Sequence, residues 1–289
     1  MTHLVNDPQT FAADVLAGFT AAHPGRVRQV LGGVVRAAAT PPGEVAVVLG
    51  GGSGHYPAFA GWVGAGMAHG AVCGNFFASP SADHVASVAR AADGGGGVLL
   101  GFGNYAGDVL QFGQAAEDLR AEGVDVRIVT VTDDIASAAD PEQRRGIAGD
   151  LMVFKIAGAA AAAGADLDEV ERIARHANAR TRTIGVALSG CALPGQDHPL
   201  FTVAPGSIAL GLGIHGEPGL STQPLGSATD VADDLVRRVL AERPAGVRRC
   251  WSMGWARPHM RSSSPSTDRW PPGWPRPAWR WWPRRWAST

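Results

Sequence analysis

The stretch VAVVLGGGSGH, residues 45–55, decides the fold of this chain. Its first five residues are all apolar, which is typical of a strand buried on both faces, as in a parallel sheet covered by helices. The glycines that follow indicate a tight turn where another group approaches the backbone closely. Ser53 and His55 then place polar atoms at the carboxyl end of the strand, where open α/β sheets bind their ligands.

The glycine-rich run at 50–55 does not match a nucleotide-binding motif. A Walker A loop would need a Lys-Ser or Lys-Thr pair after the glycines, and a dinucleotide fingerprint would need an acidic residue after a second strand. The sequence has neither. Two interpretations stay open: a strand-to-helix turn with a purely structural role, or a polar site that includes His55.

Strand-like and helix-like segments alternate around this run, which predicts an α/β fold with a largely parallel or mixed sheet flanked by helices. A helix is expected at 8–22. Further strands are expected at 71–77, 97–101 and 126–131. Another helix is expected to open near residue 80, with Ser79 as its N-cap and Pro80 in its first turn.

The pattern continues after residue 146 and predicts a second α/β lobe. Helices are expected at 147–163, 167–177 and 229–241, and strands at 183–188 and 207–212. We place the N-terminal lobe at 1–180 and a truncated second lobe at 181–246.

Composition excludes several classes of protein. With 289 residues, 45% hydrophobic and 18% charged, the chain is typical of a soluble globular protein. It has no run of about 18 apolar residues, so we expect no membrane association. No secretory signal is visible, so a cytoplasmic location is expected. Its three cysteines are too scattered for a disulfide framework or a zinc site.

The last residues, 247–289, differ from the rest of the chain. From Gly246 onward there are nine arginines and one acidic residue, a formal charge of +8, so the first 245 residues carry −9. An acidic body argues against nucleic acid as a partner. The tail also holds eight of the nine tryptophans and seven prolines without a helical or strand period. Binding to nucleic acid or a membrane surface is one interpretation of this tail.

A reading-frame shift is the other interpretation of the tail, and the one we favour. Trp251 and Met253 have single codons and so constrain their own DNA. Read from the last base of the Arg249 codon, that DNA can encode Val-Leu-Val-Asn-Gly-Leu-Gly, a strand and turn where the second lobe needs one. Sequencing the gene tests this hypothesis, because an intact frame would contradict it.

Polar residues follow three of the strand-like runs. Asp108 closes the run Gly103-Asn104-Tyr105-Ala106-Gly107-Asp108 and is either a helix N-cap or a general base. His215 lies in GIHGEPG, residues 213–219, where flanking glycines leave its ring open to a small molecule. Together with His55, these residues predict one small pocket rich in hydrogen-bonding groups. No cysteine or additional histidine is spaced for a metal site.

Five motifs in this order resemble the substrate-binding K domain of the dihydroxyacetone kinases, over about residues 1–245. They are GGGSGH (50–55), GNYAGD (103–108), Thr-Asp-Asp (132–134), Arg-Arg-Gly (144–146) and GIHGEPG (213–219). The resemblance implies that His215 adds to the ketone carbonyl of dihydroxyacetone or a similar short ketose, forming a hemiaminal that glycerol cannot form. It implies that His55 hydrogen-bonds the hemiaminal oxygen and shuttles its proton, and that Asp108 accepts the proton of the terminal hydroxyl. The Gly52, Ser53 and Gly54 backbone would line the pocket.

The resemblance also implies partners. The phosphate donor, ATP or ADP with magnesium, would sit on a separate L domain or be supplied by a phosphotransferase system, so this chain would bind no cofactor and would not phosphorylate alone. A homodimer is expected. Two departures from the family, Tyr56 in place of Glu and Gly103 in place of Lys, keep four-carbon ketoses such as erythrulose as alternatives. A non-catalytic ketose sensor and an inactive, degenerate gene product are further alternatives.

Overall fold

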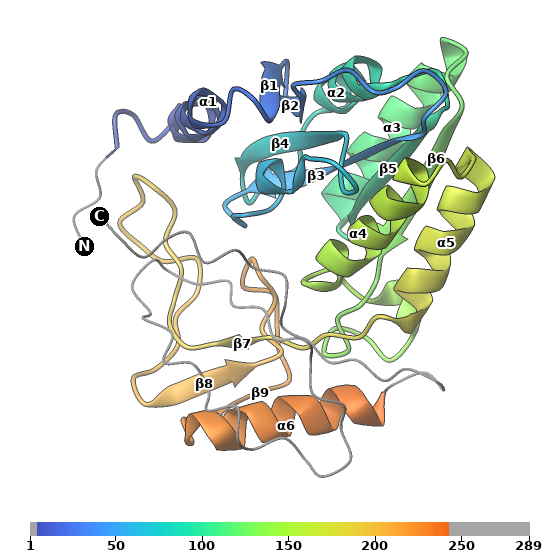
Figure 1. Cartoon of the computed structure of the whole chain (residues 1–289). Coiled ribbons are helices and arrows are strands. Elements are labelled where there is room, and N and C mark those ends of the chain that lie inside the picture. The colour runs from blue at the N-terminus through green and yellow to red at the C-terminus, as the bar shows by residue number, and fades with distance from the viewer. Residues whose placement is uncertain (1–4, 243–289) are drawn as a thin grey trace, which may run out of the picture. The chain divides into compact units, whose positions relative to one another are not determined.

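Four parallel strands form the centre of the main sheet in the computed structural model, which describes residues 5–242 (Figure 1). Their order is β4-β3-β5-β6, and a β1–β2 hairpin extends the sheet beyond β4 in antiparallel pairing. The strands are β1 (Val27–Val30), β2 (Gly33–Arg36), β3 (Ala46–Ser53), β4 (Gly70–Phe76), β5 (Val98–Gly103) and β6 (Val126–Val131). The predicted α/β fold with a largely parallel or mixed sheet is confirmed.

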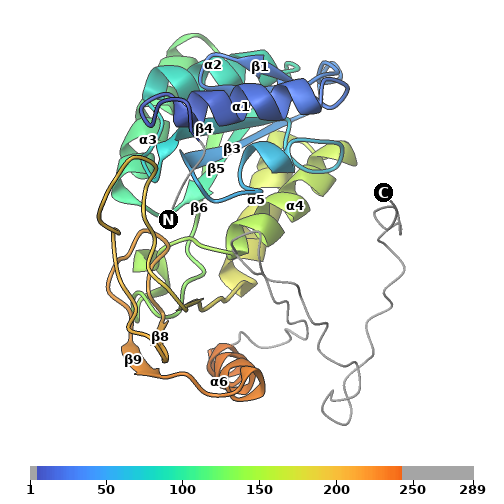
Figure 2. The ribbon, with the colours of Figure 1, turned by 90° about the vertical axis from the view of Figure 1, so that its left-hand side faces the viewer.

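Helices cover both faces of this sheet (Figures 1 and 2). On one face, Val48, Leu100 and Phe102 share a buried core with α2 (Ala82–Ala92) and α3 (Ala106–Ala121). On the other face lie α4 (Gly149–Ala162) and α5 (Leu167–Arg180). A Cβ at Gly101 would lie 2.3 Å from the Phe154 ring of α4, so a glycine is required for this close packing. Burial on both faces explains the uninterrupted apolar run at 45–49.

The edge of the sheet near the N-terminus carries α1 (Phe11–Ala22), which packs against β1 and β4 (Figure 2). The Phe11 ring stacks on Phe76, with centroids 5.2 Å apart. Two short 3-10 turns, η1 (Ala60–Trp62) and η2 (Pro141–Gln143), lie in the connections.

The helix expected near residue 80 is present as α2, but its predicted cap is wrong, and the N-cap alternative for Asp108 is excluded. The cap of α2 is Ser81, which is extended and accepts a hydrogen bond from the His84 N–H at 3.4 Å, so Ser79 and Pro80 lie before the helix. Asp108 is not an N-cap either, because α3 begins at Ala106 and places Asp108 within its first turn. The β1–β2 hairpin was not predicted, because its short strands carry too few apolar residues for a clear pattern.

A second, smaller sheet follows α5. It contains β7 (Val186–Ala187), β8 (Ser207–Leu210) and β9 (Ser221–Pro224), paired antiparallel in that order. Parallel pairing needs a crossover helix, and the described residues between β7 and β8 contain none. The boundary near residue 180 stays a prediction, since all described residues belong to one compact unit, Met1–Met253. The tail at 247–289 and its frame-shift hypothesis lie outside the described residues.

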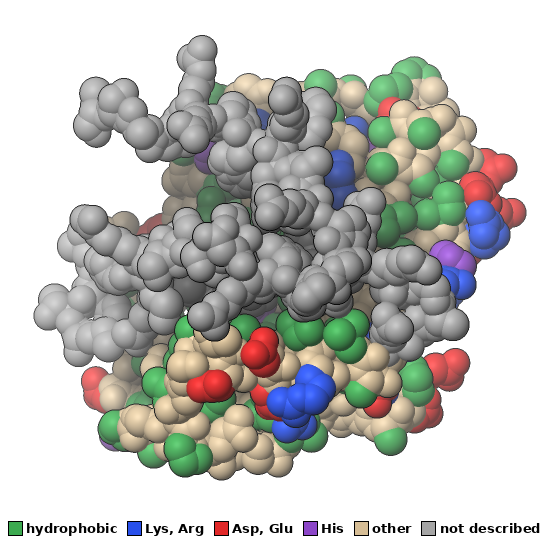
Figure 3. Space-filling view, turned by 60° about the horizontal axis from the view of Figure 1, so that its bottom comes forward, with side chains coloured by type: hydrophobic (Ala, Val, Ile, Leu, Met, Phe, Trp, Pro, Cys, Tyr) green, Lys and Arg blue, Asp and Glu red, His purple; other side chains and the backbone are tan. Residues whose placement is uncertain are grey.

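The last described helix is α6 (Ala228–Ala241), which begins with a reciprocal capping box between Ser227 and Asp230. On its surface Asp234 pairs with Arg237 and Arg238, in keeping with the mixed acidic and basic side chains on the face in Figure 3. No helix among the described residues is long and apolar enough to cross a membrane.

His69 is fully buried beside β3 and is held in one tautomer. Its Nδ1 accepts a hydrogen bond from the Val47 N–H at 3.0 Å, and its Nε2 donates to Glu44 Oε1 at 2.8 Å. Burial and then the positive charge of Arg36 lower the pKa of His69, opposed by Glu44. Protonation would place a second N–H against the Val47 N–H, so the folded protein keeps this ring neutral.

We therefore expect His69 to reduce stability as the pH falls below about 6.5, because the unfolded state then binds a proton that the folded state does not. The contribution is at most about 1.4 kcal/mol per pH unit. Urea unfolding between about pH 8 and pH 5 would compare the unaltered chain with His69→Asn, whose amide oxygen can accept the Val47 N–H. The other titrating groups are common to both proteins, so equal pH slopes would contradict this expectation.

Candidate functional site

Two histidines that lie 160 residues apart in the chain are in direct contact, with their Nε2 atoms 3.0 Å apart. His55 follows the carboxyl end of β3, and His215 lies in the loop between β8 and β9. His55 is buried, whereas the His215 side chain is 24% exposed. The structure thus joins the two sheets through a pair that sequence analysis placed in one pocket.

Aromatic rings enclose this pair. Phe77 stacks on the His55 ring at 4.8 Å and meets the His215 ring edge-on at 5.3 Å. Tyr105 packs against the His215 ring at 4.9 Å. Phe77 has φ +50°, a left-handed conformation that non-glycine residues rarely adopt. Sequence analysis singled out neither ring: Phe77 is the last residue of the strand predicted at 71–77, and Tyr105 lies inside the motif at 103–108.

The glycine run at the end of β3 makes room for the segment that carries Phe77. A Cβ at Gly52 would lie 2.7 Å from the Ala78 nitrogen, and one at Gly54 would lie 2.7 Å from the Phe77 ring. Gly54 also has φ +106°, which favours glycine. Between them, the Ser53 hydroxyl donates to the Gly74 carbonyl at 2.6 Å. These contacts give the glycines a packing role, and the predicted role of 52–54 in lining a substrate pocket stays a prediction.

A carboxylate that sequence analysis did not single out orients His215. Glu217 accepts from His215 Nδ1 at 2.9 Å and from the His215 backbone N–H at 3.0 Å. Burial alone would raise the pKa of Glu217, but these hydrogen bonds and the His215 charge lower it to about 2. Glu217 is therefore ionised at neutral pH, which fixes the hydrogen of His215 on Nδ1 and leaves a lone pair on Nε2.

The tautomer of His55 follows from that of His215. Burial, and then the charge of His215, lower the pKa of His55 to about 3, so His55 is neutral over the physiological range. Since the Nε2 of His215 carries a lone pair, we assign a hydrogen to the Nε2 of His55. The result is a directed chain of hydrogen bonds from His55 to His215 to Glu217.

Arg145 contacts the loop between β8 and β9 that carries His215 and Glu217. Its guanidinium pairs with Asp134 at 2.9 Å, donates to the Gly211 carbonyl at 3.2 Å, and lies 3.9 Å from Glu217 Oε2. The charged contacts thus run from the end of β6 to the loop between β8 and β9. They give the Thr-Asp-Asp and Arg-Arg-Gly motifs a structural role.

Asp108 lies in the first turn of α3 and is only 7% exposed. Its Oδ1 has no hydrogen-bond partner among the described residues. Burial raises the pKa of Asp108 to about 6, against the opposing effects of the Ser79 hydrogen bond and the His215 charge. A carboxyl group that titrates near neutrality can accept a proton from a bound hydroxyl.

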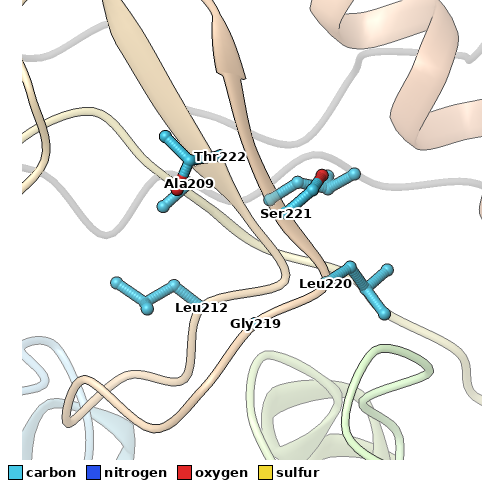
Figure 4. Close-up of a pocket in the computed structure, with 7 residues that line it drawn as sticks. Ala209, Leu212, Gly219, Leu220, Ser221 and Thr222 are labelled. Carbon is cyan, nitrogen blue, oxygen red and sulfur yellow. The ribbon is translucent and has the colours of Figure 1, made fainter.

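Two other features bear on the extent of the site. A pocket of about 140 Å³ lies on the small sheet, between the ends of β8 and β9 (Figure 4). It is lined by Leu212, Leu220, Ser221 and their neighbours, and it contains none of the site histidines or carboxylates. Tyr56, one of the two departures from the family pattern, is 72% exposed beside His55.

No group of three or more His, Cys, Asp or Glu side chains within 5–242 is placed to hold a metal ion.

Comparison with known proteins agrees with this geometry. The family model described as the Dak1 domain matches residues 17–251. An L-erythrulose 1-kinase from Mycolicibacterium smegmatis is 62% identical over 247 residues, 84% of this chain, which spans only 43% of that enzyme. The dihydroxyacetone-binding subunit DhaK of a phosphotransferase-dependent dihydroxyacetone kinase 2 from Listeria innocua is 42% identical over 248 residues, 84% of this chain and 74% of the subunit.

A solved structure shares the fold. The dihydroxyacetone kinase from C. freundii, in complex with AMP-PNP and Mg²⁺, superposes with a TM-score of 0.79 at 40% identity, covering 84% of this chain and 46% of that chain. Family model, relatives and structure agree, and this chain belongs to the Dak1 domain family of the dihydroxyacetone kinases.

Proposed function

We propose that this chain is the ketose-binding part of a kinase for short ketoses, and that it holds its substrate as a hemiaminal on His215. The observation that carries the proposal is the chain of hydrogen bonds from His55 through His215 to the ionised Glu217. It gives the exposed ring of His215 a nucleophilic Nε2, and a ketone carbonyl is the electrophile that such a nitrogen can add to.

Addition of His215 to the ketone carbonyl would involve the following bond changes. The Nε2 lone pair of His215 forms a bond to the carbonyl carbon, and the C=O π electrons move to the oxygen, which takes a proton from solvent. The ring, now positive, stays paired with Glu217 until its Nδ1 proton passes to solvent. Once Nε2 is bonded to carbon it no longer accepts from His55, whose N–H can donate to the new hydroxyl instead.

Asp108 is proposed as the base for phosphate transfer. It would accept the proton of the terminal hydroxyl as that oxygen attacks the transferable phosphate. We place the donor nucleotide and magnesium on a separate L domain, because the C. freundii enzyme that holds AMP-PNP and Mg²⁺ is about twice as long as the matched region. The homodimer and the cytoplasmic location expected from the sequence stay predictions.

We further propose a four-carbon ketose such as erythrulose as the preferred substrate. The 62% identity to an L-erythrulose 1-kinase exceeds the 42% identity to a dihydroxyacetone-binding subunit, which favours the alternative considered in the sequence analysis over dihydroxyacetone. Gly103 fits this choice, because a Cβ at this position would lie 3.3 Å from the Tyr105 ring, so the glycine lets that ring lie against the backbone at the end of β5.

Carbon-13 NMR tests the hemiaminal. Erythrulose or dihydroxyacetone labelled at the carbonyl carbon would be added to the full chain, with the same ketose in buffer as the reference for free ketone and hydrate. We expect a new resonance in the region of tetrahedral carbon, and an intact-mass increase equal to one ketose. Glycerol should give neither. Saturable binding that leaves only the ketone resonance would contradict the proposal.

Replacing Glu217 with glutamine should weaken hemiaminal formation by about 10- to 100-fold, the usual cost of losing a carboxylate that orients a reactive histidine. Glutamine keeps the size of the side chain but loses the charge that holds the proton on Nδ1. The apparent affinity would be measured by the same NMR titration. Glu169→Gln, on the exposed surface of α5, is the matched control.

For Glu217 to have the proposed role, the variant must keep the melting temperature of the unaltered chain while it loses affinity. Unchanged affinity would show that His215 does not need this partner.

A further inference from the structure

Three buried side-chain oxygens lack partners among the described residues. They are the Oδ1 of Asp108, the Oδ1 of Asp150 and the hydroxyl oxygen of Tyr105. Native structures leave few such atoms unpaired, and each one calls for an explanation such as a bound ligand or water. The mechanism above uses Asp108 and leaves the other two groups without a function.

Asp150 lies in the first turn of α4 and is 5% exposed. The neighbouring buried carboxylate, Asp133, has the hydrogen bonds expected of a carboxylate with a structural role. Asp133 accepts from the Ile147 N–H at 2.9 Å, from the Gly149 N–H at 2.8 Å and from the Thr183 hydroxyl. Asp133 thus has a donor on each oxygen, whereas Asp150 has an oxygen without one.

Electrostatic effects connect Asp150 with the site. Burial raises the pKa of Asp150 well above its usual value, and the charges of Asp133 and Asp108 raise it further. Burial, then the charge of Glu217, and then the charge of Asp150 raise the pKa of Tyr105, whose ring packs on His215. Asp150 therefore lies within electrostatic range of both Asp108 and Tyr105.

The position of Tyr105 depends on the glycine at the end of β5. A Cβ at Gly103 would lie 3.3 Å from the Tyr105 ring and 3.0 Å from the Gly146 carbonyl oxygen. Both distances are tighter than an ordinary contact, so a side chain at 103 would push the Tyr105 ring away. The glycine thus allows the aromatic ring to lie close to the backbone at this edge of the sheet.

We propose that Asp150 and Tyr105 bind the additional hydroxyl group of a four-carbon ketose, and that they therefore favour it over a three-carbon ketose. This inference rests on the proposed function. With the carbonyl carbon on His215 and one terminal hydroxyl at Asp108, dihydroxyacetone has one hydroxyl left to bind and erythrulose has two. A carboxyl group and a phenol that are both unpaired in the protein can bind that additional hydroxyl.

The test compares two ketoses on two variants of the full chain. Erythrulose and dihydroxyacetone, labelled at the carbonyl carbon, would be titrated onto the unaltered chain, Tyr105→Phe and Asp150→Ala. We expect erythrulose affinity to fall by about tenfold in each variant, and dihydroxyacetone affinity by less than about threefold. Asp168→Ala, at an exposed aspartate in the first turn of α5, is the matched control and should change neither affinity.

The Tyr105→Phe variant protects the test against misfolding, because the hydroxyl that it removes bonds to nothing in the described structure. An equal loss for both ketoses, or no loss for either, overturns this inference and leaves the hemiaminal in place. An unaltered chain that forms no hemiaminal with either ketose overturns the proposed function and this inference together.

Discussion

Replacing His215 with alanine is expected to remove the tetrahedral ketose resonance completely and to lower ketose phosphate formation by at least about 10³-fold when an L-domain protein and Mg-ATP are supplied. In the proposed hemiaminal, the covalent bond would fix the substrate at one carbon, so that the terminal hydroxyl stays oriented for transfer. Without it, the substrate would be held only by hydrogen bonds. The loss should therefore appear both in the affinity and in the maximal rate.

Carbon-13 NMR and a coupled assay for ketose phosphate would measure the two effects. His176→Ala is the matched control, because His176 is exposed on α5. The alanine variant should retain the melting temperature, since His215 lies in a partly exposed loop and not in the core. A variant that still transfers phosphate at the unaltered rate would show that His215 is not the anchor.

The sequence predicted the main sheet because its central strands are covered on both faces. Residues 45–49 show no alternation of apolar and polar side chains, which is typical of a strand covered by helices on both faces. The close packing of Phe154 on Gly101 shows how tightly one of these helical layers lies on the sheet. The β1–β2 hairpin gives no comparable signal, since β1 has exposed polar residues in its middle. Edge strands that face solvent are identified by their pairing with neighbouring strands in the folded protein, and a single sequence does not show that pairing.

Only the site residues that belong to recognisable sequence motifs were predicted. His55, Asp108 and His215 each follow a strand-like run, and this placement was enough to group them. The sequence does not reveal that Glu217 turns back onto the His215 ring, because that contact depends on the fold of a short loop. Nor does it reveal the importance of Phe77 and Asp150, whose burial and neighbours are set by segments distant in the chain.

Replacing Asp108 with asparagine is expected to separate binding from transfer. The hemiaminal should form with nearly unchanged affinity, because its chemistry lies on His215, while phosphate transfer falls by about 10²- to 10⁴-fold for want of a base. A ketose sensor, the non-catalytic alternative, needs no base at this position. A variant that binds and transfers as well as the unaltered chain would therefore favour another group as the base.

The pH profile sharpens this test. Because burial raises the pKa of Asp108 to about 6, a growing fraction becomes protonated below that pH, and the rate of transfer should fall there about tenfold per unit. His55 has a pKa lowered to about 3 and does not titrate in this range. Asp118→Asn, near the far end of α3, should keep this acid limb, and Asp108→Asn should lose it. An acid limb that persists without Asp108 would have to come from the partner domain or another group, and the raised pKa would then reflect burial alone.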